Sequence, residues 1–163
     1  RVLGAATGVN YAGLCNLFEY KRRLFLAALD RYLATVTVQI LSELEDAPSP
    51  LRGIRNAFDR AYELIKPNNV NAGCFMCNTA IELAPHDAEA AQKVQAHLKQ
   101  LRLGFQGALE RAQTVGDLSA DADAKCLGEY LATTAYSLGM LVRAGMSAAY
   151  VKRHAQNSLS ILS

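Results

Sequence analysis

The sequence predicts an all-α protein, and three observations support that class. Alanine and leucine are abundant and only 4 prolines occur in 163 residues, a balance that favours helices over strands. Apolar residues recur at spacings of three and four along several long segments, as on the buried stripe of an amphipathic helix. Turn-forming and helix-capping residues fall between these segments, where helices are expected to stop and start.

The bulk properties exclude few functions. Hydrophobic residues make up 51% of the chain and the net charge is +2, so charge alone does not identify a nucleic-acid binder. We see no apolar run long enough to span a bilayer and no secretory signal in the opening residues. The chain begins at Arg1 rather than at Met, which suggests a fragment or a processed form. We therefore expect a cytoplasmic protein without a membrane partner.

The first residues predict two short helices joined by a tight turn. Residues 1–6 are expected to end one helix, and Thr7–Asn10 to form the turn. Gly8 accommodates the positive φ that ends a helix, and Asn10 is a favourable N-cap for the next helix, Tyr11–Leu17. This pattern is typical of a helix-turn-helix.

A long helix is predicted over Lys21–Leu44 and a second over Leu51–Ile65, separated by Pro48 and Pro50, which interrupt helices. Lys66 to Gly73 is expected to be a loop. The apolar stripe of the long helix consists of Phe25, Leu29, Tyr32, Val36, Ile40 and Leu44.

Cys74–Ala84 is predicted to be a short apolar helix. Asp87 is expected to cap the next one, because aspartate accepts hydrogen bonds from the free amides of the first turn. That helix is expected to end at Gly116. Its buried face is predicted at Val94, Leu98, Leu101, Phe105, Ala108 and Ala112.

Two further helices are predicted, one over Asp123–Ala144 and one from Ser147 to about Leu162. Gly139 and Gly145 indicate either a close approach of helices or a kink and a C-cap. The apolar seams of this helix pair exceed what one copy is expected to bury, so they predict a homodimer through a four-helix bundle. These seams comprise Leu127, Leu131, Thr134, Leu138, Leu141, Val142, Val151, Ala155, Leu159 and Leu162.

Two segments resemble one known family. Residues 8–25, GVNYAGLCNLFEYKRRLF, are similar to the second half of the helix-turn-helix of TetR/AcrR family regulators, and residues 73–87, GCFMCNTAIELAPHD, resemble part of their C-terminal domain. The resemblance implies a partial helix-turn-helix domain with its connecting helix over 1–44, lacking its N-terminal part. It implies a ligand-binding and dimerisation domain over 45–163.

The resemblance also implies a double-stranded DNA partner with a palindromic operator, read by two recognition helices about one DNA turn apart. Val9, Leu14 and Phe18 are expected to anchor the recognition helix. Lys21 begins the long helix, where it can donate to a phosphate. The residues expected to contact DNA are Asn10, Tyr11, Ala12, Gly13, Cys15, Asn16 and Lys21.

The helices behind this motif are expected to enclose a small, mostly apolar ligand, because apolar walls with a few hydroxyl groups suit such a molecule. For any one of these residues, plain core packing is the alternative. The candidate lining residues are Phe58, Tyr62, Met76, Thr79, Phe105, Tyr130, Thr133, Tyr136 and Met140.

Cys74 and Cys77 have C-x-x-C spacing, but no second ligand pair completes a zinc site, so we predict no metal and no cofactor. The three histidines are expected at the surface or at helix caps. A thiol switch at Cys77 requires a lowered pKa near a helix N-terminus.

Function is therefore predicted as a ligand-responsive DNA-binding transcriptional regulator, a repressor that a small molecule releases from its operator. The chain has no glycine-rich phosphate loop and no hydrolase or zinc-protease motif, so we do not predict an enzyme. Tyr11 and Cys15 depart from the usual recognition-helix residues. They keep open a helical small-molecule-binding or redox-sensing protein with weakened DNA binding.

Overall fold

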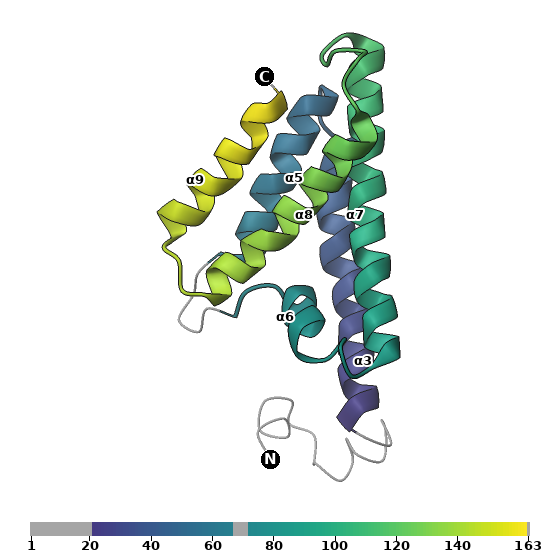
Figure 1. Cartoon of the computed structure of the whole chain (residues 1–163), viewed down its shortest axis with the longest axis vertical. Helices are drawn as coiled ribbons and strands as arrows, with labels where there is room; N and C mark the ends of the chain where they lie inside the picture. The colour runs from purple at the N-terminus through teal and green to yellow at the C-terminus, as the bar shows by residue number, and fades with distance from the viewer. Residues whose placement is uncertain (1–20, 67–71, 163) are drawn as a thin grey trace.

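The structure is a computed structural model that describes residues 21–66 and 72–162, and within these ranges every regular element is a helix (Figure 1). The predicted all-α class is confirmed. The predicted turn and recognition helix, with Asn10, Tyr11, Ala12, Gly13, Cys15 and Asn16, lie outside the described residues.

A connecting helix begins the described chain. It consists of α3 (Lys21–Tyr32), a π-helical turn η1 (Leu33–Thr37) and α4 (Val38–Glu45), which follow one another without a break. The helix was predicted from the sequence, but the π turn was not. A run of β-branched residues occupies the turn, and Thr35 donates its hydroxyl to the carbonyl oxygen of Arg31 at 2.8 Å. Both features weaken regular α-helical hydrogen bonding.

The connecting helix is also the one described helix whose length and composition would let it cross a membrane, contrary to the sequence expectation. Residues 24–41 include only two charged side chains, Asp30 and Arg31. In the structure, however, Leu29, Ile40 and Leu44 are buried in the hydrophobic core. Packing against α5 and α7 therefore accounts for part of the apolar character of this helix, because 22% of its apolar stretch is buried.

The next helix, α5 (Pro50–Ile65), starts where the sequence predicts, because Ser49 accepts a hydrogen bond from the Arg52 amide and Pro50 occupies the first turn. A Cβ atom at Gly53 would lie 3.0 Å from the carbonyl oxygen of Glu43, so a glycine here permits α4 and α5 to pack closely. The short helix α6 (Phe75–Glu82) follows.

The remaining helices are α7 (Ala88–Val115), α8 (Ala124–Arg143) and α9 (Ala148–Ser158), followed by a 3-10 turn, η2 (Leu159–Leu162). The predicted caps Asp87 and Ser147 are confirmed, and Asp123, which was predicted as the first residue of its helix, is the cap of α8. Each accepts hydrogen bonds from first-turn amides. Gly116 ends α7 with a φ of 81°. Gly145, with a φ of 78°, follows α8 as a C-terminal turn.

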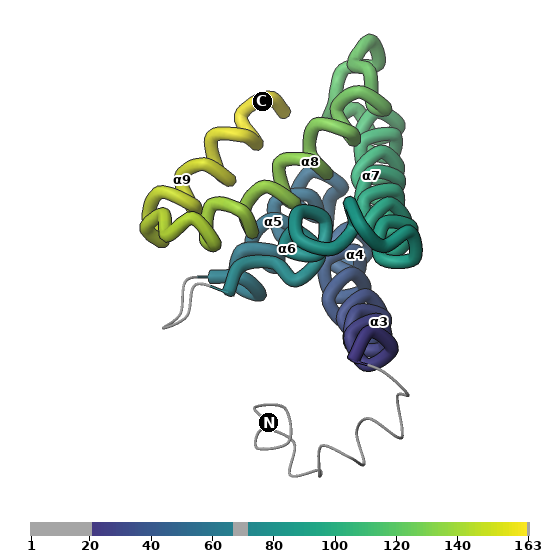
Figure 2. Tube along the Cα trace, turned by 60° about the horizontal axis from the view of Figure 1, so that its bottom comes forward, coloured from purple at the N-terminus to yellow at the C-terminus, as the bar shows by residue number. Residues whose placement is uncertain are grey.

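The connecting helix and α7 run side by side in the same direction along the long axis, with α5 and α8 beside them and α9 at one edge (Figures 1 and 2). Ion pairs at three places along their length join these two parallel helices. Arg22 lies 2.6 Å from Asp87, Lys93 lies 2.6 Å from Asp30, and Arg111 lies 3.1 Å from Glu45. The core between the helices is centred on Phe58 and Phe105, whose ring centroids are 5.6 Å apart.

Candidate functional site

The π turn brings a buried polar pair together. Oγ1 of Thr37 lies 2.9 Å from Nδ1 of His97 on α7, and both side chains are buried. The prediction that the histidines occupy surface or capping positions is wrong for His97, which is 3% exposed. Its position three residues after Val94 and four before Leu101 places it on the apolar stripe, so the spacing alone could have located it.

Burial lowers the pKa of His97 to about 4, so the imidazole is neutral at pH 7. Its ordinary pKa is about 6.5. As the pH falls from about 6.5 to about 4, His97 binds a proton in the unfolded chain but stays neutral in the folded chain. The free energy of unfolding therefore decreases across this window.

We expect His97→Gln to reduce the loss of thermal stability between pH 7 and pH 4, because glutamine removes the titrating group. Melting temperatures of wild type and variant across this range measure the effect. His86→Gln, at an exposed position, provides the control. An unchanged pH profile in His97→Gln would contradict a buried neutral imidazole.

A small cavity of about 30 Å³ adjoins this pair. Two of its polar groups are engaged: Tyr136 donates its hydroxyl to the Met76 carbonyl oxygen at 2.8 Å, and the Tyr32 hydroxyl lies 3.4 Å from Sγ of Cys74. Burial raises the pKa of both tyrosines, so both are neutral. The cavity is lined by Tyr32, Val36, Ile40, Ala61, Leu64, Ile65, Cys74, His97, Leu101, Ala135 and Tyr136.

Of the nine residues predicted to line a ligand cavity, Tyr136 lines this one. Four others are buried in the core, and Tyr62 is half-buried against it. The remaining three lie on α8 and are exposed, and one of them, Thr133, lines a separate space of about 270 Å³ between α7 and α8. They share one stripe opposite the buried leucines of α8. The four core residues are Phe58, Met76, Thr79 and Phe105, and the three exposed ones are Tyr130, Thr133 and Met140.

The cysteine-switch expectation is not met at Cys77. This thiol sits in the first turn of α6 but is buried, and burial raises its pKa to about 11. A lowered pKa was the condition for a reactive thiolate. In the part of the chain that the structure describes, no group of His, Cys, Asp and Glu side chains is arranged to hold a metal ion.

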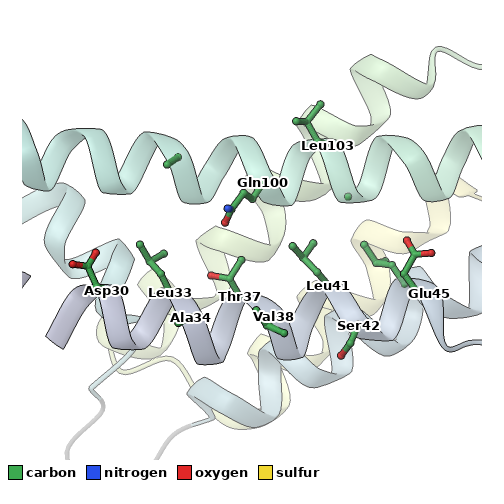
Figure 3. Close-up of a pocket in the computed structure, with 13 residues that line it drawn as sticks. Asp30, Leu33, Ala34, Thr37, Val38, Leu41, Ser42, Glu45, Gln100 and Leu103 are labelled. Carbon is green, nitrogen blue, oxygen red and sulfur yellow. The ribbon is translucent and has the colours of Figure 1, made fainter. Parts of the chain in front are cut away.

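A larger groove, of about 840 Å³, runs between the connecting helix and α7. Figure 3 shows Leu33, Thr37 and Leu41 on the side of the connecting helix that faces α7, with Gln100 reaching toward them from α7. Thr37 therefore lies between this groove and His97, which lines the smaller cavity. A movement of Thr37 would alter both spaces.

The start of the connecting helix is tied to the start of α7. Arg22 donates to both carboxylate oxygens of Asp87, at 2.6 and 3.0 Å, and to Glu89 at 3.1 Å. The Arg22 guanidinium lowers the pKa of Asp87 to about 2, with help from the Ala90 amide. Lys21, the one DNA-contact candidate among the described residues, is exposed beside this contact.

Exposed apolar side chains lie on α8 at Tyr130 and Met140, on α9 at Tyr150 and on η2 at Ile161. The apolar seams of the last two helices were predicted to be too extensive for one copy to bury, but in the structure they are largely buried within the chain. Leu131, Leu138, Val142 and Val151, for example, are fully buried. These buried residues are therefore not available for contact with a second copy.

Gly139 belongs to the interior of the chain. A Cβ atom at this position would lie 2.3 Å from Cβ of Cys74, so only a glycine allows α8 to meet the start of α6 this closely. Of the two readings left open for this residue, close helix approach is confirmed. The chain segment that it contacts is the one that carries the cavity thiol.

Comparisons with known proteins agree with this architecture. A family model described as "Tetracyclin repressor-like, C-terminal domain" matches residues 50–157. The HTH-type transcriptional regulator YezE of Bacillus subtilis (strain 168) is 30% identical over 156 residues, which cover 95% of this chain and 80% of that protein.

Two solved structures share the fold. The TetR family transcriptional regulator CifR, complexed as a cysteine mutant with 26-bp operator DNA, superposes with a TM-score of 0.83 at 22% identity, over 97% of this chain and 83% of that one. A TetR transcriptional regulator from Chloroflexus aurantiacus J-10-FL gives a TM-score of 0.83 at 24% identity, over 98% and 80% of the two chains.

Proposed function

Because the chain belongs to the TetR family of transcriptional regulators, we propose that it is a repressor that a small, mostly apolar molecule releases from a palindromic DNA operator. The observation that carries this proposal is the connecting helix. It begins at Lys21, directly after the segment with helix-turn-helix sequence, and passes Thr37, which is bonded to a residue of the cavity. One continuous element thus links a DNA-reading segment to a ligand site.

Release requires that the ligand bind one arrangement of this helix more tightly than the other, since only differential affinity shifts an equilibrium. In this scheme the DNA contacts are those expected from the sequence, at Asn10, Tyr11, Ala12, Gly13, Cys15, Asn16 and Lys21. The protein acts in the cytoplasm, where its DNA lies. The redox-sensing alternative loses support because the Cys77 thiol is buried with a raised pKa.

The DNA-binding proposal is tested with the full-length protein and the DNA upstream of its own gene. We expect tight binding that weakens steeply with salt, because counterions leave the phosphates on binding. Lys21→Ala should weaken binding to all sequences and reduce the salt slope by about 1. Lys125→Ala, on α8, is the control and should leave both unchanged. Absence of salt-dependent, sequence-specific binding by the wild type would overturn the proposal and favour the small-molecule-binding alternative.

We also propose that two copies pair through the exposed sides of α8, α9 and η2, where Tyr130, Met140, Tyr150 and Ile161 are exposed. Apolar residues on two neighbouring antiparallel helices suit a four-helix bundle with a second copy. The arrangement would hold two recognition helices at the spacing of a two-fold symmetric operator.

Met140→Glu is expected to shift the protein from dimer toward monomer, because it places a charge where apolar surface is to be buried. Sedimentation velocity over a range of concentrations measures this shift. Leu103→Glu is a matched control: Leu103 is 47% exposed and Met140 48%, but Leu103 lies on α7 beside the groove. A monomeric wild type, or equal effects of both variants, would contradict this interface.

A further inference from the structure

We infer that the ligand is an uncharged molecule whose carbonyl oxygen accepts a hydrogen bond from Nε2 of His97, and that Thr37 passes this event to the connecting helix through the π turn. The inference rests on the proposed function, whose ligand and relay it specifies. Four features of the cavity support it.

The first feature is the state of the polar groups that line the cavity. The hydroxyls of Tyr32 and Tyr136 are engaged by Cys74 and Met76, and Nδ1 of His97 is engaged by Thr37. Nε2 of His97 makes no hydrogen bond to any residue that the structure describes. This nitrogen is therefore the ring atom left for a ligand, on a side chain that is 97% buried.

The second feature is the proton on the imidazole. Helical threonines elsewhere in this chain donate to the backbone carbonyl four residues earlier, as Thr79, Thr114 and Thr133 do. The Thr37 hydroxyl makes no such bond, and among the described residues its hydrogen-bond partner is Nδ1 of His97. We assign the hydroxyl as the donor to Nδ1, which places the ring proton of the neutral histidine on Nε2. The ligand atom that meets Nε2 must then be an acceptor. The opposite tautomer, in which Nδ1 donates to Thr37, would overturn this assignment in the NMR experiment below.

The third feature is charge. None of the eleven residues that line the cavity is Asp, Glu, Lys or Arg. A charged ligand would lose its hydration without gaining an ionic partner, which is costly. The acceptor is thus best supplied by an uncharged ketone, ester or lactone with an apolar body.

The fourth feature is the combination of a small cavity with a π turn. A volume of about 30 Å³ holds a single water molecule, so a ligand must displace side chains around His97. The π turn contains one residue more than a regular turn. Its conversion to α-helix would rotate the preceding helix by roughly 100° and shift it by about 1.5 Å.

The Thr37–His97 bond opposes that conversion. In a regular α-helix Thr37 can donate to the carbonyl oxygen of Leu33, as the other threonines do to theirs. Displacement of the His97 ring frees the hydroxyl for this bond. The rotation would reach Lys21, because α3 continues the same helix without a break, and it would require the Arg22–Asp87 and Asp30–Lys93 ion pairs of α3 to open.

The chemistry is tested by NMR on the full-length protein labelled with ¹⁵N at histidine, with cyclohexanone, cyclohexanecarboxylate and cyclohexylammonium as probes of matched ring size. In the free protein, the His97 signals should show a protonated Nε2 and an unprotonated Nδ1. Cyclohexanone should shift the Nε2 signal, and the two charged probes should not. A proton on Nδ1, a response to a charged probe, or no response to cyclohexanone would overturn the ligand assignment.

The relay is tested by Thr37→Val, which keeps the shape of the side chain but removes its hydroxyl. We expect operator affinity of the ligand-free variant to fall by at least about five-fold, the lower end of typical allosteric effects. Thr114→Val is the control, because the Thr114 hydroxyl also bonds only to a backbone carbonyl oxygen but lies on α7, outside the π turn. It should stay within about two-fold of wild type. Equal operator affinity of Thr37→Val and wild type would overturn the relay.

The two proposals fail separately. If the wild type binds its operator but His97 has the other tautomer, or its Nε2 signal does not shift with cyclohexanone, the inference fails and the repressor proposal stands. If no operator binding occurs, the repressor proposal fails whatever the NMR signals show.

Discussion

Replacement of Phe105 by alanine is expected to lower the free energy of unfolding by about 3–5 kcal/mol, because it empties the centre of the core. Phe105 is fully buried, and its ring packs 5.6 Å from that of Phe58 across α5 and α7. The loss combines the transfer of the ring out of the core with the cavity that it leaves. Urea unfolding at fixed protein concentration measures it.

Leu103→Ala is the control, because it truncates an apolar side chain on the same helix where that chain is largely exposed. It should cost well under about 1 kcal/mol. A double-mutant cycle with Phe58→Ala separates the ring–ring contact, worth about 0.5–1.5 kcal/mol. If Phe105→Ala costs no more than Leu103→Ala, Phe105 is not the core residue described above, and its predicted place in a ligand site returns.

The second large effect is expected at Gly139. Gly139→Ala places a Cβ atom 2.3 Å from Cβ of Cys74, and backbone atoms of Cys74 lie within 3.2 Å, so the start of α6 must move away from α8. Overpacking of this kind typically costs about 1–3 kcal/mol. The melting temperature should fall by about 2–4 °C for each kcal/mol lost.

Gly107→Ala is a matched control within α7. A Cβ atom there would meet only the end of the Arg111 side chain, at 3.6 Å. Alanine is favoured over glycine inside a helix by about 1 kcal/mol, so this variant should be slightly more stable than wild type. Equal stabilisation of both variants would mean that helix propensity, rather than the contact with Cys74, governs Gly139.

The helices could be predicted from the sequence because their signals are local. Ser49 with Pro50, Asp87, and Gly116 each mark a helix end by the conformation or hydrogen bond that they provide. The long connecting helix followed from apolar spacing. Its π turn did not, because Leu33–Thr37 reads as ordinary helix until the Thr37–His97 bond, between residues 60 positions apart, is known.

The candidate site was harder to predict because it depends on which side of each helix faces inward. Of the nine proposed lining residues, Tyr136 lines the small cavity. Tyr130 and Met140 show the limit: aromatic and flexible apolar residues suit a ligand cavity and an exposed helix face equally well. Only the packing of α8 against its neighbours separates these two environments. Tyr32, Cys74 and His97 meet only through contacts between distant helices.

The carboxylate of Asp87 serves two purposes at once. It accepts hydrogen bonds from the Glu89 and Ala90 amides in the first turn of α7, and it forms an ion pair with Arg22 of the connecting helix. Serine could still cap α7 but could not form the ion pair with Arg22. Glutamate would keep the negative charge, but its longer side chain is not favoured as an N-cap. Of these three residues, only aspartate both caps α7 and pairs with Arg22. A substitution at this position should therefore weaken one of the two contacts, although the residue does not line the small cavity. Position 87 therefore tolerates few substitutions, because its one side chain bonds to two helices.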